Sequence, residues 1–206
     1  PPHKVGRYTQ IFGPEYLGRT VMLSVFHVLQ AIGLYGFINW MPTFLVHEGV
    51  SIPHSLGYTF GMALVAPLGA LLCLSFADKV ERKWQIVGAA LAVAASGLVF
   101  SQFHSPYIII PMGGFELLSA AILSYNFHAY QAELFPTRIR VEAIGFVYSW
   151  SRISAIFSGF LIAYVLGHYG VTWVFLVIAG SMLLVALFIG VMGPPTTNRS
   201  LETLSP

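Results

Sequence analysis

Apolar residues gather in six long segments of the chain, separated by short stretches of Pro, Gly and charged residues. The segments run approximately over residues 20–41, 55–77, 84–103, 106–130, 143–167 and 170–192. Each is close in length to the roughly 20 apolar residues that a helix needs to cross a bilayer. Because backbone groups in lipid must be hydrogen bonded within their own segment, these segments are predicted to be helices joined as hairpins.

The composition supports a bilayer as the solvent. Hydrophobic residues make up 56% of the 206 residues and charged residues 9%, with a mean hydropathy of +0.75, whereas ordinary soluble domains carry about 25% charged residues. The net charge of +2 is too small to indicate a nucleic-acid partner, and the single cysteine, Cys73, cannot form an internal disulfide. The chain begins with Pro and shows no cleavable signal peptide, so we expect a fragment or a processed chain.

Basic residues mark one side of the predicted bundle. The connections near 42–54, 104–105 and 168–169 contain no Lys or Arg. The other connections and the two ends carry all the basic residues except one, namely Lys4, Arg7, Arg19, Lys79, Arg82, Lys83, Arg138, Arg140 and Arg199. By the positive-inside rule, residues 1–19 and 194–206 are predicted to be cytoplasmic and residues 20–193 to form the transmembrane bundle.

Two charged residues lie inside the apolar segments, at a similar predicted depth. At about 1.5 Å per residue, Glu116 lies about 15 Å below the outer surface and Arg152 about 14 Å above the inner one. A charge in the bilayer centre costs at least about 2.5–3.5 kcal/mol, so each should face a partner or a cavity. We expect Glu116 to face an interhelical cavity opposite Arg152. Such a carboxyl group could carry a proton, and its protonation would release Arg152 to bind a substrate carboxylate; a purely structural ion pair is the alternative.

Other polar side chains at membrane depth could line a water-filled path. In the first segment these are Gln30, Tyr35 and Asn39, and His27 shares a helix face with Gln30. In the fourth segment the candidate is Asn126. Interhelical hydrogen bonding explains each of them equally well. Tyr148 and Trp150, which flank Arg152 in the fifth segment, are interpreted equally well as packing residues.

Six helices also describe intramembrane serine proteases, with Ser96 as the nucleophile and His128 as the base. Helix geometry places Ser96 about 10 Å and His128 about 33 Å from the outer face. A nucleophile and its base must lie within about 3 Å of each other, so this interpretation is excluded. The sequence also shows no metal-ligand spacing, phosphate loop or dinucleotide fingerprint. We therefore expect no enzyme activity, no cofactor and no metal.

Two loops on the predicted cytoplasmic side mix charges of both signs at helix ends. FADKVERK, residues 76–83, carries Asp78, Arg82 and Lys83, and AELFPTRIR, residues 132–140, carries Glu133, Arg138 and Arg140. Opposite charges at neighbouring helix ends can form bridges that hold one face of a bundle shut. We predict a cytoplasmic gate here, with anchoring of the helix ends at lipid headgroups as the alternative.

Four motifs resemble those of the major facilitator superfamily, in the branch that contains sugar porters, organic-ion transporters and metabolite:proton symporters. FADKVERK resembles the D-x-x-G-R-[RK] loop, with Glu81 in place of the usual Gly, and AELFPTRIR resembles the more specific E-x-[FY]-P-T-x-x-R element. PPTTNRSLE, residues 194–202, resembles the terminal P-E-T-K-G-R-S-L-E, and GLYGFINWMPTFL, residues 33–45, resembles the end of the seventh helix. The resemblance extends over nearly the whole chain.

The resemblance implies an all-α membrane protein in which six transmembrane helices form the C-terminal half of a twelve-helix bundle. Transporters of this kind work by alternating access, in which two halves rock about a site near the midplane. Tyr35 stands where sugar porters usually carry Asn after Gln30 and Gly33, and residues 106–130 lack the Trp that sugar porters tend to have. These differences and the two lone charges favour a charged or carboxylate-bearing substrate over a neutral sugar.

We therefore predict secondary transport of a small organic solute, with proton symport of an organic ion or carboxylate as the favoured mechanism. The predicted substrate-binding residues are Gln30, Tyr35, Asn39, Asn126 and Arg152, and the predicted proton-coupling residue is Glu116. The expected partners are the substrate, protons, the lipid bilayer and the missing N-terminal half, in a plasma membrane or bacterial inner membrane. Facilitative sugar transport and a non-transporting six-helix module are the alternatives.

Overall fold

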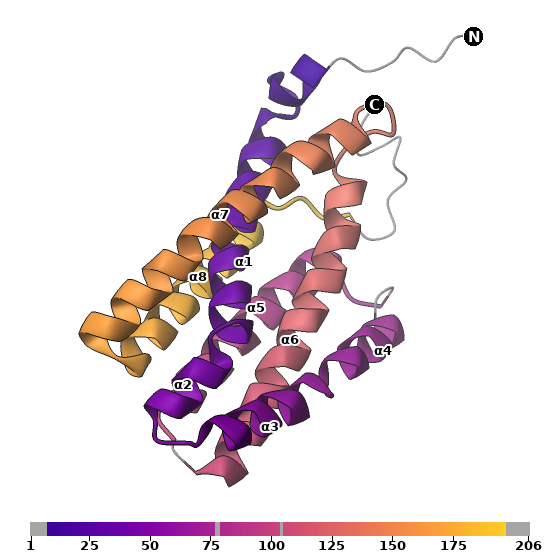
Figure 1. Ribbon diagram of the computed structural model, residues 1–206. Coiled ribbons are helices and arrows are strands. Elements are labelled where there is room, and N and C mark those ends of the chain that lie inside the picture. Colours follow the sequence, from indigo (N-terminus) through magenta and orange to yellow (C-terminus); the bar gives the residue numbers. More distant parts are fainter. Residues whose placement is uncertain (1–7, 77–78, 104, 197–206) are drawn as a thin grey trace.

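The computed structural model describes residues 8–76, 79–103 and 105–196, which form a helical bundle (Figure 1). A short 3-10 helix, η1 (Tyr8–Phe12), precedes α1 (Leu17–Ile38), α2 (Met41–His47), α3 (Ile52–Ala63), α4 (Ala66–Phe76), α5 (Arg82–Phe100), α6 (Pro106–Glu133), α7 (Arg140–Tyr169) and α8 (Val171–Met192). By length and composition, six stretches can cross a membrane: Leu17–Ile38, Ile52–Cys73, Arg82–Phe100, Tyr107–Glu133, Arg140–Tyr169 and Val171–Met192. They match the six predicted segments to within four residues at each end, and the chain is a multi-pass membrane protein.

A proline lies in the first turn after each of two breaks between helices, whereas Pro111 lies inside α6 without ending it. Pro42 lies in the first turn of α2, directly after the break between α1 and α2. Pro67 lies in the first turn of α4, and the break before it falls at residues 64–65. Proline lacks an amide hydrogen and its ring clashes with the preceding turn, so a new helix begins at each site. The single helix predicted over residues 55–77 is therefore wrong in this detail, because the span is built from α3 and α4.

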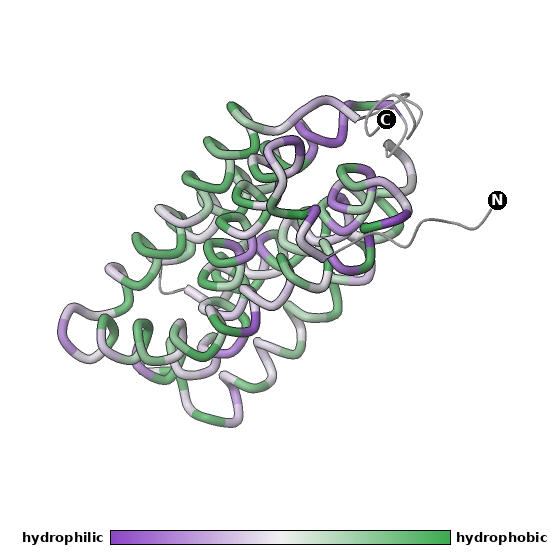
Figure 2. The backbone as a smooth tube through the Cα atoms, turned by 90° about the horizontal axis from the view of Figure 1, so that it is seen from above, coloured by the Kyte–Doolittle hydropathy of each residue, from purple (hydrophilic) through white to green (hydrophobic). Residues whose placement is uncertain are grey.

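The helices pack as two groups around α5 and α8. The first group pairs α1 with α7, and the second sets α3 and α4 against α6. α5 packs extensively on both α6 and α8, and α8 also packs on α1. By contrast, α6 makes few contacts with α1 or α7. Figure 2 shows the hydrophobic colour spread along the turns of the bundle in the view from above.

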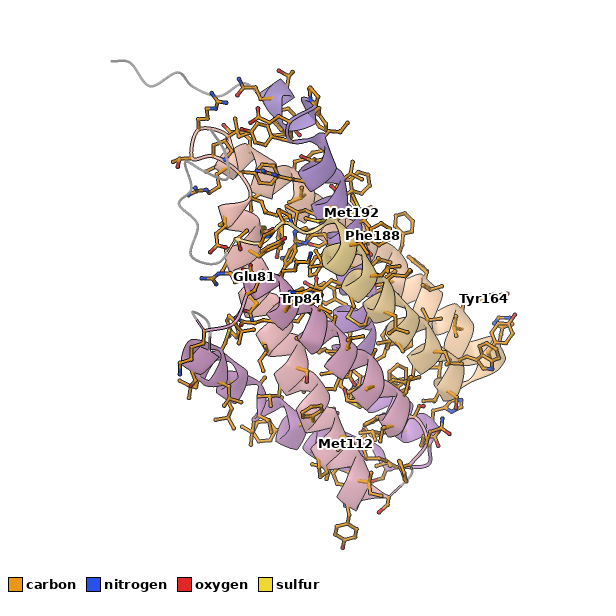
Figure 3. All side chains as sticks on the ribbon, turned by 180° about the vertical axis from the view of Figure 1, so that it is seen from behind. Glu81, Trp84, Met112, Tyr164, Phe188 and Met192 are labelled. Carbon is orange, nitrogen blue, oxygen red and sulfur yellow. The ribbon has the colours of Figure 1, made fainter. Side chains whose placement is uncertain are left out.

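One end of the bundle, here called the charged end, contains the start of α5, the end of α6 and the end of α8. The Arg19 guanidinium of α1 reaches this end and donates to the backbone oxygen of Leu134 at 2.7 Å. Tyr130 Oη donates to the backbone oxygen of Pro194 at 2.8 Å, and the Thr196 amide donates to Glu81 Oε1 at 2.8 Å. These bonds hold the segment after α8 between α5 and α6, and Figure 3 shows Glu81 and Met192 towards the same end, with Met112 at the opposite one.

Candidate functional site

Arg152 stands at the centre of a small polar cluster on α7. Its guanidinium donates to Tyr35 Oη of α1 at 3.3 Å and to Tyr148 Oη of its own helix. The guanidinium carbon also lies 4.8 Å from the centroid of the Tyr148 ring, within cation–π distance. Arg152, Tyr35 and Tyr148 are called the tyrosine–arginine cluster below. The Arg152 side chain is exposed, and it forms no salt bridge with any carboxylate in the described part of the chain.

Glu116 lies elsewhere, so the predicted pairing of Glu116 with Arg152 is wrong. Only 1% of the Glu116 surface is exposed, and Oε2 accepts no hydrogen bond from the described residues. Its carboxyl group borders a cavity of about 10 Å³, enclosed by Gln30, Val93 and Met182 among others. The physical reason for the separation is the direction of the side chain: Glu116 points towards α1, α5 and α8, and α6 scarcely contacts α7. This cavity, which is close to the volume that one water molecule needs, is called the carboxyl cavity.

A larger opening, the central groove, runs between α1, α4 and α6. It has a volume of about 260 Å³ and is lined by Leu34, Ile38, Ala66, Leu117, Ala120, Ala121, Ser124 and Tyr125. Tyr35 follows Leu34 on α1, but none of the three residues of the tyrosine–arginine cluster is among the residues that line this groove. Asn126 does not line the groove. It is 1% exposed, donates to the backbone oxygen of Ile122 at 3.0 Å and lies beside Cys73 of α4.

The remaining predicted substrate residues are divided between these places. Gln30 is largely buried and lines the carboxyl cavity beside Glu116. Asn39 is exposed at the C-terminal end of α1, where its backbone amide donates to the Tyr35 oxygen at 3.2 Å. The structure therefore brings Tyr35 together with Arg152 and Gln30 together with Glu116, and it separates both pairs from Asn126.

The predicted gate residues meet at the charged end. Arg82 Nε at the start of α5 lies 2.9 Å from Glu133 Oε1 at the end of α6, which makes an interhelical ion pair. Arg140 donates to the Phe135 backbone oxygen at 3.2 Å, and Arg138 lies beside Tyr16. The Lys83 ammonium lies 5.3 Å from the centroid of the neighbouring Trp84 ring. Asp78 falls outside the described residues.

The geometry agrees with the exclusion of a serine protease. Ser96 Oγ donates to the Val93 backbone oxygen of α5 at 3.2 Å, and His128 Nδ1 lies 2.6 Å from the Ser124 backbone oxygen of α6. Each side chain is therefore bonded within its own helix, and the two do not form a nucleophile–base pair.

Two polar contacts were not assigned by the sequence analysis. Tyr148 joins Arg152, and the i, i+4 spacing of the two residues on one helix could have signalled this contact. The second contact joins His27 Nε2 of α1 to Gln131 Oε1 of α6 at 3.1 Å. The two residues are 104 positions apart, and no local pattern connects them.

Comparisons with known proteins agree with this architecture. The sequence matches the family model of the Major Facilitator Superfamily over residues 23–204. It is 31% identical over 194 residues to the putative metabolite transport protein YyaJ of Bacillus subtilis, covering 94% of this chain and 43% of that protein. It is 25% identical over 201 residues to the niacin transporter NiaP of Acinetobacter baylyi, covering 96% of this chain and 45% of that protein. The chain thus spans less than half the length of these relatives.

Among solved structures, the fold is similar to that of the proton:xylose symporter XylE bound to 6-bromo-6-deoxy-D-glucose. The TM-score is 0.76 at 22% sequence identity, and the match covers 98% of this chain and 44% of that one. At this level of identity the likeness concerns the fold. Because the family model covers most of the six-helix bundle, the chain belongs to the major facilitator superfamily, whose members are transporters and not enzymes.

Proposed function

We propose that the full-length protein is a proton-coupled secondary transporter of a small organic carboxylate, working by alternating access. The observation that carries this proposal is the unneutralised Arg152 inside a membrane span. Two of its nitrogens are held by Tyr35 and Tyr148, and none lies within ion-pair distance of a described carboxylate. A charge at this depth is costly without a counter-charge. A substrate carboxylate would supply that charge and could accept paired hydrogen bonds from the guanidinium.

The niacin transporter among the relatives supports an aromatic carboxylate as the substrate class. Niacin is a pyridine ring that carries one carboxylate. The tyrosine–arginine cluster offers a cation and two aromatic rings in one place. This combination suits a flat molecule with a single negative charge, since ring faces stack on aromatic side chains and the cation fixes the acid group.

Proton coupling is assigned to Glu116. Its carboxyl group is buried, Oε2 has no hydrogen-bond partner among the described residues, and a water-sized cavity lies beside it. A carboxyl oxygen next to such a cavity can exchange a proton with a water molecule. Gln30 of the carboxyl cavity and Tyr35 of the cluster are both on α1. A displacement of α1 would therefore connect proton transfer with substrate binding.

The charged end is assigned to the cytoplasmic side of a plasma membrane or bacterial inner membrane, because the positive-inside rule places basic loops there. The Arg82–Glu133 ion pair joins α5 to α6 at this end. The pair would hold the inner side closed in one half of the transport cycle and would break when that side opens.

The proposal is tested with the full-length protein in liposomes, with the internal pH recorded while nicotinate, nicotinamide or xylose is added outside. We expect proton influx with nicotinate alone, and we expect Glu116→Gln to abolish it. Nicotinate uptake without proton movement would remove the coupling role of Glu116. Uptake of xylose but not nicotinate would replace this proposal with sugar transport, and uptake of none of the three would overturn it.

A further inference from the structure

His27 of α1 makes a buried polar contact between the two helix groups. Its surface is 2% exposed, and so is that of its partner Gln131 near the end of α6. The His27 Nε2 and Gln131 Oε1 atoms are 3.1 Å apart. Elsewhere α1 and α6 make few contacts. These include the stacked rings of Phe26 and Phe127 and the contact of the His27 ring with the Phe127 ring, whose centroids are 5.0 Å apart. The His27–Gln131 bond is therefore a specific link across the boundary between α1 and α6.

On one side, His27 contacts the tyrosine–arginine cluster. The His27 and Tyr148 rings meet edge to face, with centroids 5.4 Å apart and an interplanar angle of 87°. Tyr148 in turn accepts a hydrogen bond from Arg152. Because the two rings are in contact, a change in the position of the Tyr148 ring must be accommodated by His27.

On the other side, His27 reaches the ion pair of the charged end. Gln131 lies two residues before Glu133 on α6, and Glu133 pairs with Arg82 at 2.9 Å. A rotation or shift of the last turn of α6 moves both residues together, since they belong to one helix. Pairwise contacts thus run from Arg152 through Tyr148, His27 and Gln131 to the helix end that carries Glu133.

The hydrogen-bonding capacity of the imidazole is only partly used. With the proton on Nε2, His27 donates to Gln131 Oε1, and the buried Nδ1 has no partner among the described residues. An apolar ring could fill the same space without leaving a buried polar atom unsatisfied. The unpartnered Nδ1 of His27 instead costs folding free energy. Such a group fits a role in which the contact changes during function.

We propose that His27 is a positioning residue that couples substrate binding at Arg152 to the Arg82–Glu133 ion pair, with Tyr148 and Gln131 as its two neighbours. The inference rests on the proposed function, because it takes the tyrosine–arginine cluster as the substrate site. It assigns His27 no contact with the substrate. His27 instead sets how strongly the state of the charged end affects the affinity at the cluster.

The test is a linkage measurement on the full-length protein. The dissociation constant of nicotinate is measured with and without Glu133→Gln, first with His27 present and then in His27→Phe, which keeps a ring against Tyr148 but loses the bond to Gln131. Coupling between two sites typically amounts to about 5–150-fold in affinity. We expect Glu133→Gln to change nicotinate affinity by at least about 5-fold with His27 present and by less than about 2-fold in His27→Phe.

Two further variants separate coupling from folding. Ser154→Ala removes a partly buried bond between α7 and α1, from Ser154 Oγ to the Val28 backbone oxygen at 2.7 Å, and it should keep the full linkage. His27→Gln retains a donor towards Gln131 and should restore part of the linkage that His27→Phe removes. An undiminished linkage in His27→Phe, or an equal loss in Ser154→Ala, would overturn the inference.

A ligand-free measurement keeps this inference distinguishable from the proposed function. We expect Arg152→Gln to speed amide hydrogen exchange in the last turn of α6 by at least about threefold with His27 present, and not in His27→Phe. If nicotinate fails to bind the unsubstituted protein, the proposed function is overturned. The hydrogen-exchange rates of the last turn of α6 then decide on their own whether His27 connects Arg152 to that turn. Equal exchange responses in the two backgrounds would overturn that role.

Discussion

The ion pair between Arg82 and Glu133 is expected to hold the charged end closed with a modest free energy. The two side chains remain 21% and 25% exposed, with Nε and Oε1 2.9 Å apart. Exposed pairs contribute about 0.2–1 kcal/mol, whereas breaking a fully buried pair costs about 3–5 kcal/mol. Partial exposure places this pair between those limits, at about 1–2 kcal/mol. That free energy corresponds to about a 5–30-fold change in an opening equilibrium.

Hydrogen exchange of the full-length protein measures this equilibrium. Arg82→Gln or Glu133→Gln should speed exchange in the first turn of α5 and the last turn of α6 by about 5–30-fold. The double variant should be about as open as either single variant, because the pair is already broken in each. Lys83→Gln is the matched control: it removes the same charge one residue further on, from a side chain that lies over Trp84.

Two results would refute this reasoning. If the effects of Arg82→Gln and Glu133→Gln add in the double variant, the two residues act independently and their contact does not hold the end closed. If Lys83→Gln opens the same turns to the same extent, net charge at this end is responsible instead of the ion pair.

Three further outcomes are expected. Gly69→Ala should lower the free energy of unfolding by about 1–3 kcal/mol, because the added Cβ would lie 2.8 Å from Ala121 Cβ and 3.1 Å from the Leu118 backbone oxygen. The control Gly88→Ala, with no such neighbour within 4 Å, should not lower it. Equal melting temperatures of the two variants would contradict the packing of α4 on α6. Glu116→Met should raise the melting temperature while abolishing proton movement, since it removes a buried oxygen without a partner; a lower melting temperature would indicate a structural role. Tyr35→Phe removes the hydroxyl that accepts from the Arg152 guanidinium and positions it. Loss of this one hydrogen bond should weaken nicotinate binding by about 2–12-fold, and an unchanged affinity in a binding titration would remove Tyr35 from the site.

The length and apolar content of the segments, together with the placement of charge, were sufficient to predict the six spans, because the bilayer requires each spanning segment to be apolar over its own length. The break before Pro67 was missed for a related reason: the whole stretch is apolar, so hydropathy alone does not show where a proline interrupts it. The Arg82–Glu133 pair was accessible from sequence, since both residues lie at ends of helices joined in order along the chain.

The direction of individual side chains was less accessible. Depth estimates placed Glu116 and Arg152 at the same level, but a level does not specify which face of a helix a residue occupies in the assembled bundle. The structure turns Glu116 towards α5 and α8 and Arg152 towards tyrosines. The His27–Gln131 contact depends on long-range packing in the same way, since neither residue is near the other in the sequence.

The central claim, that Arg152 binds the carboxylate of the substrate, is tested most directly by comparing nicotinate with its neutral analogue nicotinamide. Dissociation constants are measured for both compounds with the unsubstituted full-length protein and with Arg152→Gln. Hydrogen bonds to charged groups contribute about 1.5–3 kcal/mol, so Arg152→Gln should weaken nicotinate binding by at least about 10-fold and leave nicotinamide binding unchanged. An equal loss for both compounds, or no loss for nicotinate, would contradict the account.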